Sequence, residues 1–148
     1  MSKFILKFNQ IGIKDVAKVG GKNASLGEMY RNLTKKGVRV PSGFATTSEA
    51  YWYFIESSDL RDKIGAILEG LDIRNVSDLS QRAKKIRDLI LKSPFPKDLE
   101  EAIVLAYKEL SAEYGLKAVD VAVRSSATAE DLPWAVSRSS SAVTVLKV

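Results

Sequence analysis

Apolar residues in the middle of the chain recur at spacings of three and four, which predicts three consecutive amphipathic helices. The first is expected to follow Asp59 as its N-cap, the second to begin near Ser77 and the third near Lys97. Pro94 interrupts the pattern between the second and third helices, and Gly115 is a typical stop after the third. Because each helix has one apolar face, we expect the helices to cover one side of a sheet.

The N-terminal third of the chain has a mixed pattern, which predicts two short strands around a helix. Residues 3–11 are rich in Phe, Ile and Leu and are expected to form an edge strand. After a turn over residues 12–18, an apolar face over residues 24–33 predicts a helix that stops at Gly37. A second strand is expected over residues 44–47, after a proline-glycine turn.

Residues 120–123 predict a further strand, because β-branched side chains favour a strand over a helix. The chain thus combines short strands with helices. At 148 residues it is long enough to bury a core as one domain. We therefore expect a single domain over residues 1–148, of the α+β class, with helices packed on a small mixed sheet.

The composition excludes several kinds of chemistry. The chain has no cysteine, which excludes disulfides, thiolate metal sites and cysteine nucleophiles. It also has no histidine, which removes the commonest general base, the usual transition-metal ligand and a phosphorylatable imidazole.

The net charge of +5 and the pI near 9.4 would suit an anionic partner, so a basic nucleic-acid-binding module is one alternative. However, the 23 basic residues are interleaved with 18 acidic ones, without a basic tail, which is typical of a solvated surface. No apolar run approaches the roughly 20 residues that a membrane span requires. We expect a cytoplasmic protein with no membrane partner, and nucleic acid is the less favoured partner.

The first candidate site begins at Arg124, which follows the strand predicted over residues 120–123. A guanidinium beside a hydroxyl-rich loop suits a phosphate, because hydroxyl and backbone N–H groups can complete the contacts to its oxygens. The alternative is a strand that runs into an ordinary polar turn, with Arg124 paired to a nearby acid. The hydroxyls in question belong to Ser125, Ser126 and Thr128, and the nearby acids are Glu130 and Asp131.

The second candidate is the segment Gly20-Gly21-Lys22, placed where a helix is predicted to start. It is not a Walker A loop, which would need glycine at Val16 and Ser or Thr at Asn23. Glycines, a helix N-terminus and a lysine nevertheless favour an anion. The alternative interpretation is a glycine turn with a solvated lysine.

Three motifs resemble, in the same order, those of one nucleotide-binding domain. They are VGGKNASLGEM over residues 19–29, VPSGFATTSEAY over residues 40–51 and VAVRSSATAEDLP over residues 121–133. Together they are similar to the domain shared by phosphoenolpyruvate synthases (pyruvate, water dikinases), pyruvate phosphate dikinases and rifampicin phosphotransferases. The chain is thus identified as a member of this family, as its N-terminal ATP-binding part.

The resemblance implies the first lobe of an ATP-grasp-like domain, in which two lobes clamp ATP. The second lobe with its metal-binding carboxylates, the phosphohistidine domain and the pyruvate-binding barrel would lie beyond Val148. The parent enzyme would convert ATP, pyruvate and water to phosphoenolpyruvate, AMP and phosphate through a phosphohistidine. We expect a fragment that is inactive alone, with ATP as cofactor and with Mg²⁺ bound through ligands outside this chain.

The resemblance also implies roles for individual residues. The family lysine that corresponds to Lys22 contacts the ATP phosphates, and Arg124 would hold the terminal phosphates. Glu130 or Asp131 would orient one of these cations through a salt bridge. The remaining expected phosphate contacts are Gly20, Gly21, Ser125, Ser126 and Thr128.

Residues 134–142 depart from the family pattern, whereas residues 143–148 again look like the family's next strand. The departure falls on the loop expected to close over the phosphates. It leaves open a second alternative, an interaction domain of the same ancestry that no longer binds nucleotide.

Overall fold

The computed structural model of the chain describes residues 3–128 and 141–147. Its described residues form two compact units. The first unit comprises Met1–Trp52 and Lys97–Val148, and the second comprises Tyr53–Pro96. Within the described residues, no helix is long and apolar enough to cross a membrane.

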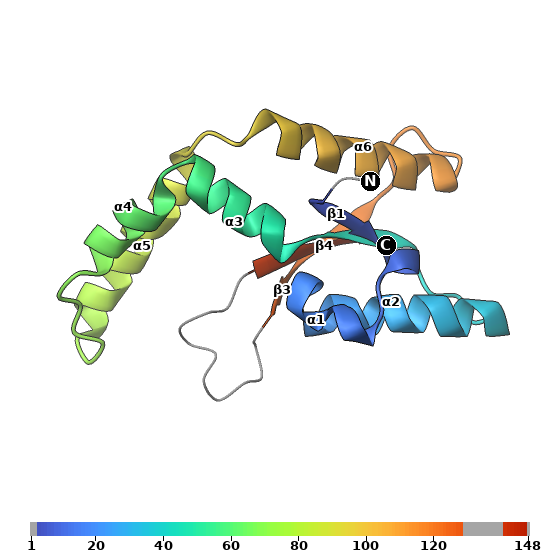
Figure 1. Cartoon of the computed structure of the whole chain (residues 1–148), viewed down its shortest axis with the longest axis horizontal. Coiled ribbons are helices and arrows are strands. Elements are labelled where there is room, and N and C mark those ends of the chain that lie inside the picture. The colour runs from blue at the N-terminus through green and yellow to red at the C-terminus, as the bar shows by residue number, and fades with distance from the viewer. Residues whose placement is uncertain (1–2, 129–140, 148) are drawn as a thin grey trace. The chain divides into compact units, whose positions relative to one another are not determined.

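The first unit contains one four-stranded sheet with the order β1-β2-β4-β3 (Figure 1). Every neighbouring pair is antiparallel, so the expected mixed sheet is wrong. β2 runs opposite to both its neighbours, and β3 and β4, which follow each other along the chain, also pair in opposite directions. The strands are β1 (Ile5–Lys7), β2 (Gly43–Thr46), β3 (Val121–Ala127) and β4 (Ser141–Lys147).

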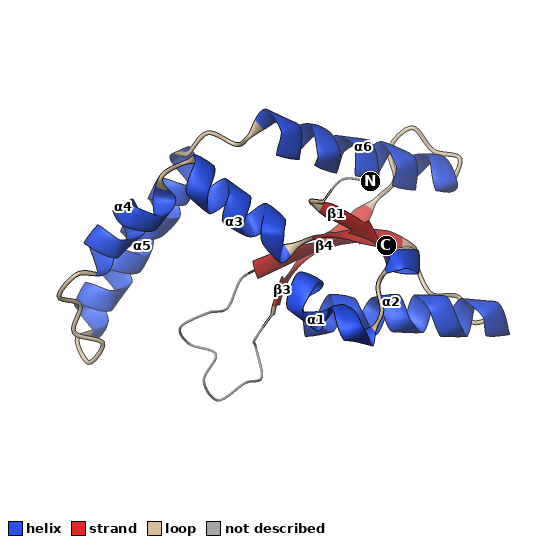
Figure 2. Cartoon of the chain, in the orientation of Figure 1, coloured by secondary structure: helices blue, strands red, loops and turns tan. Residues whose placement is uncertain are grey.

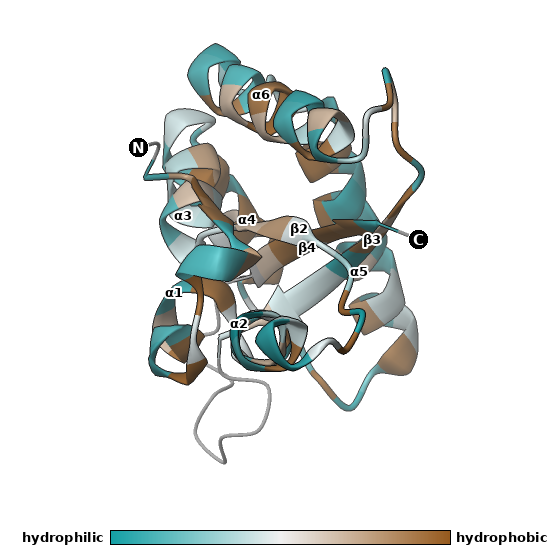
Figure 3. Cartoon of the chain, turned by 90° about the vertical axis from the view of Figure 1, so that its right-hand side faces the viewer, coloured by the Kyte–Doolittle hydropathy of each residue, from teal (hydrophilic) through white to brown (hydrophobic). Residues whose placement is uncertain are grey.

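Helices lie on both faces of this sheet, with α2 (Gly21–Leu33) on one side and α6 (Lys97–Glu113) on the other (Figures 2 and 3). Adjacent residues of β2 point to opposite faces, and each belongs to a separate core. Ala45 packs in the core on the α2 side, and Phe44 packs in the core on the α6 side. The α2-side core also contains Phe8, Ile11, Val19 and Ala24, and the α6-side core contains Ala106, Leu110, Val119 and Val145.

The segment between β1 and α2 is more helical than its sequence predicted. The strand expected over residues 3–11 is confined to β1, because a 3₁₀ turn follows at Phe8–Gln10. The turn expected over residues 12–18 contains a second 3₁₀ turn, Ile13–Asp15, and the short helix α1 (Val16–Val19). α2 then continues through the 3₁₀ turn Thr34–Lys36. The predicted stop is confirmed, since Gly37 follows with a φ of 81°.

The second unit is helical and contains α4 (Leu60–Leu68) and α5 (Val76–Lys92). α3 (Ser48–Ser57) leads into it from the first unit. The starts predicted for α4, α5 and α6 are correct to within one residue. Of the three predicted helices, α6 shares a unit and a core with the sheet, whereas α4 and α5 belong to the second unit. Asp59 makes no side-chain bond to the start of α4, whereas Asn75 does cap α5 by accepting from the N–H of Asp78.

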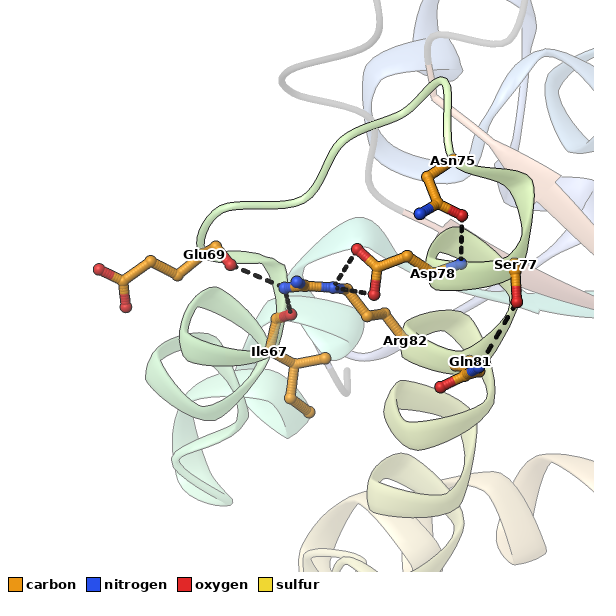
Figure 4. Close-up of polar contacts among 7 residues, drawn as sticks. All are labelled: Ile67, Glu69, Asn75, Ser77, Asp78, Gln81 and Arg82. Carbon is orange, nitrogen blue, oxygen red and sulfur yellow. Dashed lines mark hydrogen bonds and ion pairs between the residues drawn. The ribbon is translucent and has the colours of Figure 1, made fainter.

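Arg82 on α5 forms hydrogen bonds with the C-terminal end of α4 (Figure 4). Its Nε donates to both carboxylate oxygens of Asp78, at 2.9 Å each. Its Nη1 donates to the carbonyl oxygens of Ile67 and Glu69, at 2.7 Å each. Carbonyls at a helix end have no partner within the helix, so Arg82 satisfies groups that α4 itself cannot.

Candidate functional site

The turn between α1 and α2 lies directly against the end of β3. Gly20 forms this turn with φ 82° and ψ 161°, a conformation that is essentially restricted to glycine. A Cβ atom on Gly20 would lie 2.3 Å from Oγ of Ser126 and 2.7 Å from the carbonyl oxygen of Ala127. The structure therefore brings together the two segments that the sequence singled out separately, the glycine turn and the segment after residue 123.

Asn23 anchors the first turn of α2, and it was not among the predicted site residues. Its side chain is fully buried. Its Nδ2 donates to the carbonyl oxygen of Val19 at 2.7 Å, and its Oδ1 accepts from the hydroxyl of Thr144 on β4. A single asparagine after Lys22 was the only signal in the sequence, and its partner on β4 lies 121 positions away.

The segment from Arg124 to Ser126 belongs to a strand, so the hydroxyl-rich loop expected there is wrong. β4 pairs with β3 along its whole length and places Arg124 opposite Thr144. Because side chains alternate along a strand, Arg124 and Ser126 share one face and Ser125 lies on the other. The three predicted hydroxyls therefore do not converge on one point. Thr128 is the only one of them beyond the strand, and it is half-buried.

Arg124 and Ser126 lie on the face of the sheet against which the glycine turn packs, because Gly20 lies close to Ser126. Arg124 and Lys22 are both exposed. Gly21 adjoins open space, with no atom within 4 Å of where its Cβ would stand. Two cations and an accessible backbone turn therefore belong to the same side of the sheet.

Ser126 differs from its neighbours because its Oγ is buried. Among the described residues, this hydroxyl has no hydrogen-bond partner. Only 2% of the residue is exposed, and the hydroxyl faces Gly20 between turn and strand. Glu130 and Asp131, the expected orienting acids, lie outside the described residues, as does the departing part of residues 134–140.

Acidic side chains hold the segment that leads into the glycine turn. Asp15 accepts from the N–H of Gly12 and from Nζ of Lys18, at 3.1 Å each. The bond from Lys18, followed by that from Gly12, holds the pKa of Asp15 below its ordinary value. Glu28 on α2 accepts from the N–H of Ile13 at 3.1 Å, and this backbone bond lowers the pKa of Glu28.

These carboxylates fix the path of residues 12–18 and do not form a cation site. Within residues 3–128 and 141–147, no three acidic side chains gather where they could hold a metal ion. The chemistry available at the turn is thus that of two exposed cations, backbone N–H groups at the start of α2 and nearby hydroxyls. Such a set suits an anion with several oxygens.

Comparison with known proteins points to the same region. Over residues 16–138, the chain matches the family described as pyruvate phosphate dikinase, AMP/ATP-binding domain. This match includes the glycine turn, Asn23 and Arg124.

Curated relatives are phosphoenolpyruvate synthases. The chain is 54% identical over 129 residues to that of Aquifex aeolicus, which covers 87% of the chain and 15% of the relative. It is 51% identical over 131 residues to that of Helicobacter pylori and 48% identical over 132 residues to that of Escherichia coli, each covering 16% of the relative. The chain thus spans about a sixth of the length of these relatives. Because the family match over residues 16–138 covers most of the chain, the chain belongs to the pyruvate phosphate dikinase AMP/ATP-binding domain family.

Proposed function

We propose that this chain is the ATP-binding first lobe of a phosphoenolpyruvate synthase-like phosphotransferase. The observation that carries the proposal is the contact of the Gly20 turn with Ser126, on the sheet face that Arg124 shares. An ATP-grasp-like arrangement, in which a second lobe closes over the nucleotide, is part of the proposal. The parent reaction would convert ATP, pyruvate and water to phosphoenolpyruvate, AMP and phosphate through a phosphohistidine.

In this proposal the chain's residues bind and orient phosphate groups. Arg124 presents a planar guanidinium to the terminal phosphates, and Lys22 neutralises their charge from the turn. The N–H groups at the start of α2 add dipoles of the right sign. Mg²⁺ would neutralise further charge on the nucleotide, with its protein ligands outside this chain.

The lobe alone is expected to bind weakly and to transfer no phosphoryl group. Each hydrogen bond to a charged group contributes about 1.5–3 kcal/mol, so two cations contribute about 3–6 kcal/mol before the cost of association. A millimolar dissociation constant corresponds to about 4 kcal/mol. The chain also has no histidine to accept a phosphoryl group.

The test is a titration of the isotope-labelled chain with Mg-ATP, followed by amide chemical shifts. We expect saturable shifts at Gly20, Gly21 and Lys22 and along β3, which Arg124→Ala and Lys22→Ala weaken. Arg87→Ala is the matched control, because Arg87 is exposed on α5 in the second unit.

Three outcomes would each contradict a part of the proposal. Equal shifts in wild type and in both site variants would mean that ATP binds elsewhere. A flat titration of a folded chain at millimolar Mg-ATP would favour the alternative of an interaction domain without nucleotide binding. Turnover of ATP to AMP by the purified chain would overturn the expected lack of activity.

A further inference from the structure

We infer that Asn23 and Thr144 are positioning residues, which fix the place of Lys22 on the glycine turn relative to Arg124 on β3. The inference deepens the proposed function and rests on it. Neither residue is expected to contact the nucleotide, because both side chains are buried.

Both polar atoms of the Asn23 side chain are hydrogen-bonded within the fold. Asn23 is 0% exposed and Thr144 is 1% exposed. The Asn23 amide donates to the last carbonyl of α1, that of Val19, and accepts from the Thr144 hydroxyl. A buried amide without partners is costly, so this side chain favours one arrangement of turn and strand.

Asn23 and Thr144 are the immediate neighbours of the two cations, Lys22 and Arg124. Asn23 follows Lys22 directly along the chain, and Thr144 is the cross-strand partner of Arg124. Directly opposite residues on antiparallel strands have Cβ atoms about 4.5–5.5 Å apart on the same face. One buried hydrogen bond therefore links the residue beside Lys22 to the residue beside Arg124.

Gly20 alone does not fix the position of the turn. Its backbone turn permits the close approach to Ser126, but the Ser126 hydroxyl has no partner among the described residues and so supplies no directional bond there. The bond between Asn23 and Thr144 is directional, and hydrogen bonds weaken steeply when their geometry departs from linear. The pair thus defines the orientation in which α2 starts against the sheet.

The experiment compares Asn23→Ala, Thr144→Val and the double variant, with Ser111→Ala as control. Ser111 is 1% exposed and also makes two hydrogen bonds, donating to the carbonyl of Tyr107 and accepting from the N–H of Val119. It belongs to α6, on the other face of the sheet, and so measures the general cost of losing a buried hydroxyl.

The first readout is amide hydrogen exchange, which needs no nucleotide. The N–H of Gly20 donates to the carbonyl of Val16 and that of Ala24 to the carbonyl of Gly20, so these two amides report on the turn. Asn23→Ala and Thr144→Val are expected to speed exchange at Gly20 and Ala24 by about tenfold, and the double variant is expected to add little. Ser111→Ala is expected to leave these amides unchanged. Equal rates at Gly20 and Ala24 in wild type and Thr144→Val would overturn the inference, even where Asn23→Ala fails to fold.

The second readout is the dissociation constant for Mg-ATP, corrected for the folded fraction. Each single variant is expected to weaken binding by about tenfold, Thr144→Ser to retain wild-type affinity through its hydroxyl, and Ser111→Ala to bind as wild type. Unchanged affinity in Thr144→Val would overturn a positioning role and leave a structural one. Absence of binding in wild type would instead contradict the proposed function, and the exchange rates would still decide whether the pair holds the turn.

Discussion

Gly20 and Gly21 are adjacent in the sequence, but only Gly20 is in a conformation and at a contact that exclude a side chain. Gly20 has a positive φ, and its missing side chain leaves room for Ser126. Gly21 begins α2 and adjoins open space. Only the first position should therefore require glycine for folding.

Gly20→Ala is expected to lower the free energy of unfolding by about 2–5 kcal/mol, since backbone strain and overlap with Ser126 add. Gly21→Ala is expected to change it by less than about 1 kcal/mol, because alanine is the better helix former. Urea unfolding followed by circular dichroism measures both values. Comparable losses in the two variants would show that the turn is not closed on β3 as described.

Some residues of the candidate site could be predicted from the sequence and others could not. Gly20, Lys22 and Arg124 were predicted because glycine and charged side chains are recognisable wherever they lie. Asn23 was not predicted, because its hydrogen-bond partner Thr144 lies 121 positions away and only the folded chain brings the two together. The assignment of Ser125 to the same cluster as Ser126 overlooked that successive strand residues point to opposite faces.

At the scale of elements, β3 is the clearest difference between pattern and structure. The strand predicted over residues 120–123 was expected to end at Val123, because the small hydroxyl residues that follow are typical of a loop. The strand continues to Ala127 because β4 supplies a partner along that length. Pairing between strands thus overrides local preference, and the residues expected to form a phosphate loop instead belong to the edge strand of the sheet.

Asp15 makes the 3₁₀ turn before α1 sensitive to acid. Because hydrogen bonds from Lys18 and Gly12 lower the pKa of Asp15, its stabilisation is complete above the ordinary pKa of 3.8 and is lost as pH falls through the lower folded value. Asp15→Asn is expected to cost less than about 1 kcal/mol at pH 6, because Lys18 is mostly exposed. Urea unfolding at pH 6 and pH 3 should show the difference from wild type shrinking. A difference that stays constant would contradict this role.

Arg82 should be the polar position of the α4 and α5 pair that is most sensitive to substitution, because its side chain is half-buried between them. Arg82→Ala removes the bonds to Asp78 and to two carbonyls at the end of α4, and we expect a loss of about 1–3 kcal/mol in the stability of the second unit (Figure 4). Arg87→Ala on the same helix serves as the control and should change it by less than about 0.5 kcal/mol. Amide exchange in α4 measures the effect. Equal exchange in the two variants would mean that Arg82 does not hold the helix end.

At the scale of the whole molecule, the helical spacings predicted the elements correctly but not their grouping. The same three- and four-residue period occurs in α5 and α6, yet α6 contributes Ala106 and Leu110 to a core and α5 has no buried residue. Periodicity shows which face of a helix is apolar, and it does not show how much other surface is available to cover that face.

This difference in burial predicts unequal local stability within the chain. α5 has no buried residue and α4 has only Leu60, whereas α2 has three and β4 lies between two paired strands. Segments with few buried contacts open at lower free-energy cost, so amides of α4 and α5 should exchange at least about tenfold faster than those of α2 and β4. Hydrogen-exchange mass spectrometry of the intact chain measures this. Gly20→Ala should speed exchange in α2 while leaving α5 unchanged, because the two helices belong to different units. Protection of α5 equal to that of β4, or its loss together with α2, would mean that the chain unfolds as one cooperative body.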